Sequence, residues 1–454
     1  MQRYETALFI FRRDLRLVDN TALNEALRTS RRVIVCFIFD PRQIEAHAYQ
    51  SQVALHFLIQ SLDDLATQCA ALGVNLAFFA GLPVDVIETL HREHSLDAVF
   101  FNRDYTPFSR ERDSDIAQLC HALHIDLMVT ADALLNEPEH AMKSDGRPYK
   151  VFTAFYNHAR QRNVALPRPL DKGAWLAVAS TVNLDTVAKT ALAPKPIITG
   201  GRTHALVQLA KVSACADYAQ TRDFPALQRT SYLSAHLKFG TLSVREIFYH
   251  IANTLGIEHP LLRQLYWRDF LTHIAYHFPH VFGHAFIDKF DQLPWENKSD
   301  YFQAWTQGKT GFPIVDAGMR ELNATGFMHN RVRMIVASFL TKDLRISWRW
   351  GERYFAQHLV DYDPCLNNGN WQWAASTGCD AQPYFRIFNP WLQQQKFDAN
   401  GEYIYRWLPE LRGVPIKTIH QWDKKHTGTQ YPAPLVDHAK ETHITKAMFK
   451  LAEH

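Results

Sequence analysis

Five short hydrophobic runs within the first 130 residues constrain the fold more than any other feature of this sequence. They are rich in β-branched and aromatic side chains and lie at 7–11, 33–39, 75–80, 98–102 and 126–130. Each run has the length and composition of a buried β-strand. The segments between them are amphipathic, with leucine and isoleucine recurring at helical spacing. Strands that alternate with helices form parallel sheets covered on both faces. We therefore predict an α/β domain over residues 1–134, built on a doubly wound parallel sheet.

The segment after the first predicted strand lacks the GxGxxG pattern of dinucleotide-binding loops. Its sequence, RRDLRLVDN, instead offers Asp19 or Asn20 as the N-cap of the next helix. In doubly wound sheets a ligand still tends to bind beyond the carboxyl ends of the strands. Any ligand of this domain is therefore expected near 12–16, 40–47 and 102–113.

The rest of the chain has a different pattern. Prolines interrupt residues 135–202, which we predict to be an interdomain linker that still contains one helix near 149–160. Over residues 203–454 strand signals nearly vanish, and ten of the eleven tryptophans lie there. Helical spacing is clearest in five hydrophobic residues, Val332, Ile335, Val336, Phe339 and Leu340. We predict that 203–454 forms an all-α domain, joined by the linker to the α/β domain.

The stretch 361–390 combines short carboxylates and amides with tryptophans. Aspartate and asparagine can hydrogen-bond the edge of a heterocycle, and indole rings offer a large area for packing. This composition suits a bound flavin or nucleobase, although a buried aromatic core with capped helix ends would have the same composition. Beside the hydrophobic stripe, Asn330, Arg333 and Met334 share a second, more polar helix face, which suits the wall of a site.

Overall composition narrows the class of protein only slightly. Hydrophobic content of 47%, charged content of 21% and a net charge of +3 are typical of a globular protein and neither require nor exclude nucleic acid. The six cysteines lack CxxC or zinc-ligand spacing, so we expect reduced thiols in a cytoplasmic protein, with no disulfide and no metal. No stretch reaches membrane-spanning length, and we expect a soluble protein with no membrane contact.

Several longer motifs carry a resemblance to a known family. They are FRRDLRLVDNTAL (11–23), TSYLS (230–234), QLYWRDF (264–270), WTQGKTGFPIVDAGMREL (305–322), GFMHNRVRM (326–334) and NNGNWQWAASTGCDAQPYFRIFNP (367–390). Together they closely resemble the photolyase and cryptochrome flavoproteins, and most of all the class I cyclobutane pyrimidine dimer (CPD) DNA photolyases. The resemblance implies an N-terminal antenna domain and a C-terminal helical domain that holds a U-shaped FAD. It also implies light-driven repair of the dimer in damaged DNA by electron transfer from reduced FAD.

The resemblance assigns residues to the FAD. Asn367 resembles the amide that faces flavin N5, and Arg333 and Asp361 resemble the charged pair beside the ring, with Asp363 nearby. Small hydroxyl groups and N–H groups at a helix start suit the FAD phosphates. The residues implied for this phosphate loop and its wall are Tyr218, Thr230, Ser231, Leu233 and Ser234.

A second group of residues is assigned to the lesion. Trp267 and Trp373 resemble the two indoles that pack against the flipped-out dimer. The other implied contacts to the lesion or its phosphates are Arg222, Asn330, Arg331 and Met334. The sequence HNRVRM around Met334 favours the cyclobutane dimer over the (6-4) photoproduct. Gln264 departs from the pattern, because class I members usually carry glutamate there, and we expect slower dimer splitting as a result.

Trp371, Trp348 and Trp295 resemble a chain of indoles that passes electrons to oxidised flavin; without the resemblance each would be interpreted as a core residue. In the antenna pocket Phe108 and Ser109 replace the Asn and Glu of folate-binding members. An 8-hydroxydeazaflavin, FMN or methenyltetrahydrofolate antenna therefore stays open. We expect a monomer with no obligate protein partner. The alternative functions are a cryptochrome-type blue-light photoreceptor and a (6-4) photoproduct photolyase.

Overall fold

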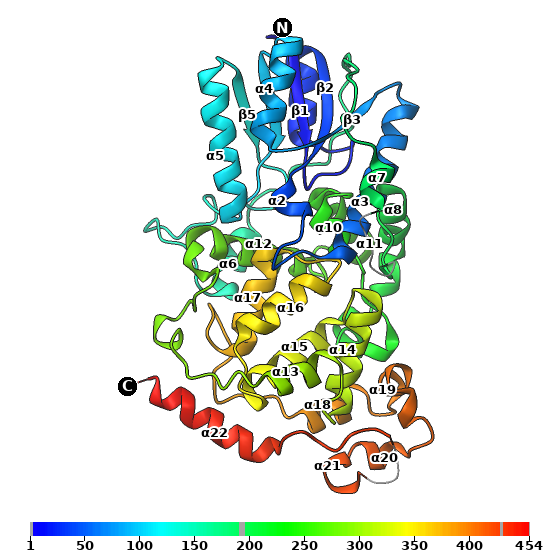
Figure 1. Cartoon of the computed structure of the whole chain (residues 1–454), viewed down its shortest axis with the longest axis vertical. Coiled ribbons are helices and arrows are strands. Elements are labelled where there is room, and N and C mark those ends of the chain that lie inside the picture. The colour runs from blue at the N-terminus through cyan, green and yellow to red at the C-terminus, as the bar shows by residue number, and fades with distance from the viewer. Residues whose placement is uncertain (1–2, 190–195, 427–429, 454) are drawn as a thin grey trace. The chain divides into compact units, whose positions relative to one another are not determined.

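The computed structural model describes residues 3–189, 196–426 and 430–453, so positions 190–195 of the predicted linker lie outside the described residues. The chain forms two compact units. The first, called the sheet unit, comprises the residues up to Ala216 and Ser231–Pro279. The second, called the helical unit, comprises Asp217–Thr230 and the residues from His280 onward. Figure 1 shows the two units as ribbons, with most of the longer helices and strands labelled.

The sheet unit contains one five-stranded parallel sheet in the order β3-β2-β1-β4-β5. Its strands are β1 (Tyr4–Phe11), β2 (Ser30–Phe39), β3 (Leu76–Ala80), β4 (Ala98–Asn102) and β5 (Asp126–Thr130). The predicted parallel sheet is therefore confirmed, and all five hydrophobic runs form strands. Strand order reverses between β1 and β4, and in such sheets that switch point is where a ligand crevice opens.

Helices cover both faces of the sheet, as expected for a doubly wound fold. Leu8 and Ile10 of β1 pack with Val86, Ile87 and Ile116 in one buried cluster. These partners come from α4 (Pro83–His94) and α5 (Pro107–Ala122), which run along the strands in Figure 1. Alternate residues of a strand point to opposite faces, so Ala7, Phe9 and Phe11 face the other side. Helices α1 (Thr21–Thr29) and α3 (Gln52–Ala71) pack against the strands as well. Asn20, one of the two predicted N-caps, accepts a hydrogen bond from the Leu23 N–H at 3.2 Å.

Within the described ranges, nine further helical segments complete the sheet unit. They are α2 (Pro41–Ile44), α6 (Phe152–Ala159), α7 (Leu184–Ala188), α8 (Arg202–Ala210), η1 (Lys211–Cys215), α10 (Ser234–Phe239), α11 (Val244–Leu255), α12 (Leu262–His277) and η3 (Pro279–Val281), whose last two residues belong to the helical unit. Helix α11 begins with a capping box, in which Ser243 and Glu246 satisfy each other's backbone N–H groups. Three helices that follow the predicted linker, α10 to α12, therefore group with the sheet by packing, while the predicted domain boundaries stay a prediction.

No strand lies beyond β5 in the described ranges, and the helical unit is built from helices alone. They are α9 (Tyr218–Thr221), η2 (Pro225–Leu227), η4 (Asp288–Phe290), α13 (Ser299–Thr306), α14 (Pro313–Thr325), α15 (Asn330–Ser338), η5 (Phe339–Asp343), α16 (Trp348–His358), α17 (Pro364–Ala375), α18 (Pro390–Phe397), α19 (Glu402–Trp407), η6 (Pro409–Leu411), α20 (Ile416–Ile419), α21 (Trp422–Lys425) and α22 (His438–Leu451).

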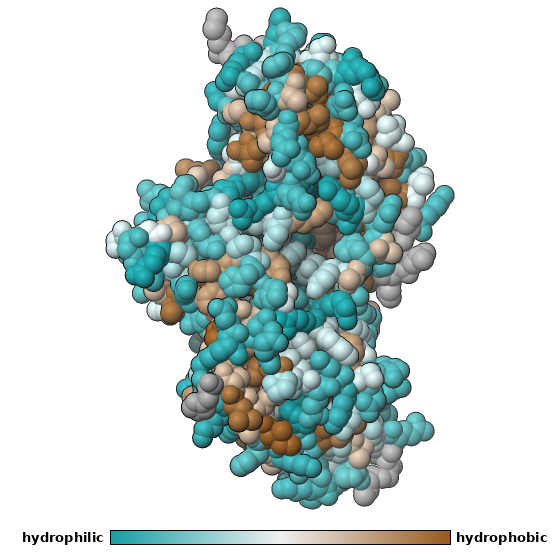
Figure 2. All heavy atoms as spheres, turned by 60° about the vertical axis from the view of Figure 1, so that its left-hand side comes forward, coloured by the Kyte–Doolittle hydropathy of each residue, from teal (hydrophilic) through white to brown (hydrophobic). Residues whose placement is uncertain are grey.

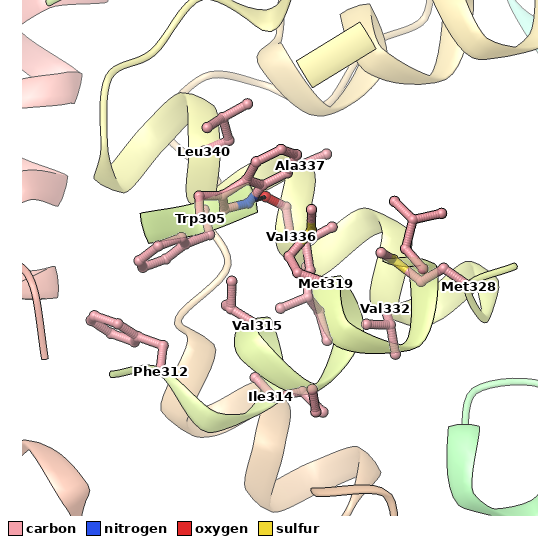
Figure 3. Packing of buried hydrophobic residues seen from close by; sticks show 14 of the residues in the cluster. Trp305, Phe312, Ile314, Val315, Met319, Met328, Val332, Val336, Ala337 and Leu340 are labelled. Atoms are coloured by element: carbon pink, nitrogen blue, oxygen red, sulfur yellow. Dashed lines mark hydrogen bonds between the residues drawn. The ribbon is translucent and has the colours of Figure 1, made fainter. Parts of the chain in front are cut away.

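The core of the helical unit forms around the predicted hydrophobic stripe. Val332 and Val336 of α15 pack against Met319 of α14, and the indole N–H of Trp305 donates to the Val336 carbonyl at 3.1 Å (Figure 3). The stripe continues into η5, a π-helix, where Phe339 and Leu340 are fully buried. Wide π-turns are rare and concentrate at functional sites.

The visible surface in Figure 2 is mostly hydrophilic, with hydrophobic residues in separate patches. None of the described helices has the length and hydrophobicity needed to cross a membrane. All six cysteines lie in the described ranges, where none of them forms a disulfide, and all but Cys379 are buried. Within the described residues, no three His, Cys, Asp or Glu side chains group in a way that could hold a metal ion.

Candidate functional site

Helix α17 carries three of the predicted site residues, Asn367, Trp371 and Trp373. Its start is well defined, because the Asp363 carboxylate accepts hydrogen bonds from the N–H groups of Cys365 at 3.0 Å and Leu366 at 3.2 Å. Pro364 occupies the first helical position, where its missing N–H removes no helical bond. Asp363 therefore has a structural role as N-cap, next to the residues that the sequence assigns to the flavin.

The amide of Asn367 has a defined orientation. Its Nδ2 donates to the backbone carbonyl of Glu352 on α16 at 2.9 Å, and the side chain is 8% exposed. This bond fixes which way the amide points, and its oxygen is the atom that can accept a hydrogen bond from a ligand. Asn367 is therefore arranged to receive an N–H group.

A buried polar ladder holds α17 in place. Asn368 donates to the Glu352 carboxylate at 3.1 Å and to the Val281 carbonyl at 2.9 Å. Gln372, one turn further on, donates to Asn368, Val281 and His284 and accepts from the Phe286 N–H at 2.8 Å. Burial raises the pKa of Glu352 to about 7. The ladder ties α17 to α16 and to the segment 281–286, and none of its members was predicted to have this role from the sequence.

Arg333 and Asp361 are 28 positions apart in the sequence, and the structure brings them together. Their side chains form a two-bonded pair at 3.2 and 2.9 Å, in which the aspartate is 5% and the arginine 24% exposed. Arg333 also donates from Nε to the Met328 carbonyl at 2.7 Å. Such a forked pair is rigid, so it can present a cation at a fixed position beside a bound ring.

The start of α15 carries the residues predicted to meet the lesion. His329 caps the helix by accepting the Arg331 N–H, and burial lowers the pKa of His329 to about 4, which keeps the ring neutral for this role. Asn330 is exposed and its Nδ2 lies 3.8 Å from the Met334 sulfur. Arg331 pairs with Asp223 at 2.8 Å and lies 4.5 Å from the Phe397 ring centroid.

Three more predicted residues of the helical unit lie in Asp217–Thr230. Arg222 is exposed, with its guanidinium 5.9 Å from the ring of Tyr218, which is half-buried. The Thr230 hydroxyl is buried, and no described residue forms a hydrogen bond with it. A buried hydroxyl without a partner is unfavourable in the protein alone, so this group fits a phosphate ligand.

The next residues of that loop belong to the sheet unit. Ser231 offers its carbonyl to Gln208 at 2.9 Å, Leu233 is buried, and Ser234 is the exposed first residue of α10. No side chain in the described part of the chain caps this helix start. These residues leave backbone N–H groups available at the position that the sequence assigns to the FAD phosphates.

Gln264 and Trp267 lie one turn apart on α12 in the sheet unit. The Trp267 ring stacks on Phe152 of α6, with centroids 3.6 Å apart and an interplanar angle of 7°. Gln264 is half-buried, and its Nε2 makes a long contact of 3.4 Å to the Pro260 carbonyl. Stacking on Phe152 fixes the indole of Trp267. The Gln264 amide is held only weakly, so it can form a hydrogen bond with a ligand.

The three tryptophans of the predicted electron-transfer chain share an unusual property. The indole N–H groups of Trp295, Trp348 and Trp371 are buried, and no described residue accepts a hydrogen bond from them. Trp407, outside the predicted chain, has the same property. In contrast, Trp305 and Trp422 donate to backbone carbonyls at 3.1 and 2.8 Å. The three rings are therefore held by packing alone, and an indole usually bonds its N–H when buried.

The segments that follow β1, β2 and β4 gather cations, two of them around the ring of Phe108. Arg12 pairs with Asp113 at 2.7 Å, while burial and the adjacent Arg112 lower the pKa of Arg12 to about 9. Phe108 lies 5.0 Å from the Arg42 guanidinium and 5.9 Å from that of Arg112. Crowded guanidinium groups beside an aromatic ring suit a planar chromophore with an anionic group.

Comparison with known proteins gives the class of protein that this fold and site define. Residues 7–171 match the family described as DNA photolyase, and residues 261–451 match the FAD binding domain of DNA photolyase. The chain is 38% identical to a deoxyribodipyrimidine photo-lyase of Synechococcus sp., covering 97% of this chain and 96% of that protein. The crystal structure of an archaeal photolyase from Sulfolobus tokodaii with two FAD molecules has a TM-score of 0.89 at 42% identity, covering 98% and 100% of the two chains. A Synechocystis cryptochrome has a TM-score of 0.89 at 29% identity, covering 99% and 100%.

This protein belongs to the DNA photolyase family, and its cofactor is FAD. The residues present fit the cofactor, because the Thr230 hydroxyl lacks a partner and the Asn367 oxygen and the Arg333 guanidinium are held by neighbours that orient them.

Proposed function

We propose that this protein is a deoxyribodipyrimidine photo-lyase that repairs cyclobutane pyrimidine dimers in DNA in a light-driven reaction. Full-length similarity to curated relatives of that name carries the proposal. When bound in its reduced form, FAD absorbs blue or near-ultraviolet light, supplies the electron that splits the dimer, and recovers it when the ring has opened. The side chains of the protein bind and orient the cofactor and the dimer, and they exclude water from the site.

We assign the cofactor side of the site as follows. Asn367 accepts a hydrogen bond from the flavin edge, and the Arg333–Asp361 pair places a cation beside the ring. Asp363 fixes the start of α17 from which Asn367 projects. The phosphate loop and its wall are formed by Tyr218, Thr230, Ser231, Leu233 and Ser234.

The lesion side uses a different set of contacts. Trp267 and Trp373 pack against the flipped-out dimer, and Gln264 hydrogen-bonds its carbonyl groups. Arg222 is exposed and able to meet phosphates. The remaining lesion contacts are Asn330, Arg331 and Met334. Because arginine–phosphate contacts release counterions, binding to damaged DNA weakens as salt rises.

Trp371, Trp348 and Trp295 form the path that delivers electrons to oxidised FAD before repair. Replacing Trp348 with phenylalanine is expected to block light-driven reduction of the flavin but to leave repair by chemically reduced enzyme unchanged. Unaffected photoreduction in Trp348→Phe would reject this path.

The same proposal covers the organisation of the chain. Residues 1–134 bind a light-harvesting antenna, 135–202 link the domains, and 203–454 bind FAD and DNA. Among the antenna candidates we favour a flavin, since the Sulfolobus tokodaii relative holds two FAD molecules. The protein acts in the cytoplasm, as a monomer without an obligate protein partner.

The function is tested with oligonucleotides that carry one defined lesion. The purified protein, loaded with FAD and chemically reduced, is expected to remove the cyclobutane dimer under blue light and not in the dark. Loss of the (6-4) photoproduct alone would identify the other repair activity. Flavin photochemistry without repair of either lesion would favour a photoreceptor, for which the cryptochrome similarity is the supporting observation.

A further inference from the structure

A lysine is buried inside the helical unit, close to the end of α17. Lys342 lies in the π-helix η5 and is 1% exposed, although lysine is rarely found at such a depth. The sequence explains its direction, because Ile335, Phe339 and Lys342 follow one another at helical spacing along the buried face. Lys342 therefore occupies a core position that a hydrophobic residue would ordinarily fill.

The amine of Lys342 is directed at the C-terminal end of α17. Its Nζ donates to the Ala375 carbonyl and to the Ser376 hydroxyl, both at 2.9 Å. Ala375 is the last residue of the helix, and Ser376 is its C-cap, with a left-handed φ of 64°. The final carbonyls of a helix have no partner within the helix, and a cation is favourable at this end. Lys342 therefore satisfies the end of α17 from outside the helix.

The third side of the amine meets an aromatic ring. Nζ lies 3.8 Å from the ring centroid of Phe449 on α22, which is fully buried. Burial lowers the pKa of Lys342 well below its usual value, while the ring face and the helix end favour the protonated amine. Among the described residues, no carboxylate pairs with this amine; the adjacent Asp343 bonds to His438 at 2.5 Å. A lysine whose role is to form an ion pair would have a carboxylate partner. Lys342 instead contacts a carbonyl, a hydroxyl and an aromatic ring, and these contacts indicate another role.

The end of α17 is where Lys342 can influence the proposed reaction. Trp371 is one turn before Ala375 on the same helix face, and Trp373 is three residues before Ser376. The Trp371 ring contacts Phe355 at a centroid distance of 4.9 Å, and its N–H has no partner among the described residues. Since packing alone holds this ring, a shift of the helix end would move it.

We propose that Lys342 is a positioning residue of the photolyase reaction, which holds the C-terminal end of α17 so that Trp371 and Trp373 keep their places. The inference rests on the proposed function of these two tryptophans. A hydrophobic residue at position 342 would leave a buried carbonyl and a buried hydroxyl without a donor, and the helix end would move to satisfy them.

The test measures light-driven reduction of bound FAD in the full chain, with dithiothreitol as external reductant and no DNA, as a rate per bound FAD. Lys342→Met keeps the hydrophobic stem and removes the donors, and it is expected to slow the reduction about tenfold, since displacements of about 1 Å have large effects on rates. Lys342→Gln keeps two N–H donors without charge and is expected to recover most of the lost rate. Lys309→Met, which removes an exposed lysine of the same unit, is the control and is expected to leave the rate unchanged.

A lower melting temperature of Lys342→Met with an unchanged reduction rate would show a merely structural lysine and overturn the proposal. A glutamine variant as slow as the methionine variant would overturn its hydrogen-bonding basis. If Lys342→Met does not retain FAD, Ser376→Ala removes one of the two acceptors, and an unchanged rate in that variant overturns the proposal as well. Failure of the proposed function is distinguishable, because the unmodified protein would then show no light-driven reduction or no dimer repair.

Discussion

Replacing Gly351 with alanine tests whether the position of Trp371 is set by close packing. Gly351 lies in α16, and a Cβ added there would be 2.6 Å from Leu340 Cδ2 and still closer to Cη2 and Cζ3 of the Trp371 ring. The ring cannot turn aside easily, because Phe355 and Trp305 contact it edge-on at 4.9 and 6.2 Å between centroids. The added methyl group therefore has to displace the indole or the helix.

The expected magnitude is the difference between two opposing effects. Alanine is favoured over glycine within a helix by about 1 kcal/mol. Overpacking a core usually costs about 1–3 kcal/mol and occasionally more, and here the new group meets a rigid ring. Because the ring is rigid, the cost falls in the upper part of that range, about 2–3 kcal/mol. We therefore expect a net destabilisation of about 1–2 kcal/mol, which lowers the melting temperature by a few degrees. The displaced indole should also slow light-driven reduction of FAD.

Gly318→Ala is the matched control. Gly318 lies in α14, and its added Cβ would press on Val332 Cγ1 and lie 3.1 Å from Val336 Cγ1, within the same core but away from the Trp371 ring. Thermal unfolding and photoreduction are measured for both variants. Both should be less stable, and only Gly351→Ala should lose photoreduction rate. A Gly351→Ala protein as stable and as photoactive as the parent would refute the reasoning, and so would equal losses of photoreduction in the two variants.

Three further predictions concern polar groups of the site. Arg333→Gln leaves the buried Asp361 carboxylate without its cation and should lower the free energy of unfolding by about 2–4 kcal/mol and release FAD. The control, Arg320→Gln, breaks the comparable pair with Glu410 and should retain FAD. Equal FAD retention in the two variants would contradict the assignment. Burial raises the pKa of Glu352 from 4.5 to about 7. The protonated carboxyl therefore contributes fully to stability below about pH 4.5, and this contribution is lost as the pH rises through 7. Glu352→Gln should flatten the dependence of stability on pH between these values, measured by denaturant unfolding. Gln264→Glu should raise the quantum yield of dimer repair, and an unchanged yield counts against the role given to Gln264.

Local patterns in the sequence were sufficient for the framework of this protein. The five strands could be predicted because a strand buried between helices needs a short, continuous hydrophobic run, and each run is complete within its own segment. The Asn20 cap is also a local interaction, made with the backbone three residues later. Arg333 and Asp361 were identified by resemblance to a family, since nothing in their own segments indicates that they meet.

Other features were decided only by the tertiary structure. Helix α22 was not predicted, and the polar pattern of its residues carries no sign that Phe449 would cover Lys342. Three such features depend on distant partners. The Glu352 carboxyl meets a residue 16 positions away, and the Lys342 amine meets one 33 positions away. The space beside Gly351 is filled by a residue 20 positions away. A buried polar group needs a hydrogen-bonding partner, and a buried glycine needs a neighbour that fills the space beside it. The residue type alone does not indicate which distant segment supplies that partner or that neighbour. The sequence therefore determined which segments become strands and which residues are candidates for the site, and the tertiary structure determined which contacts hold those candidate residues in position.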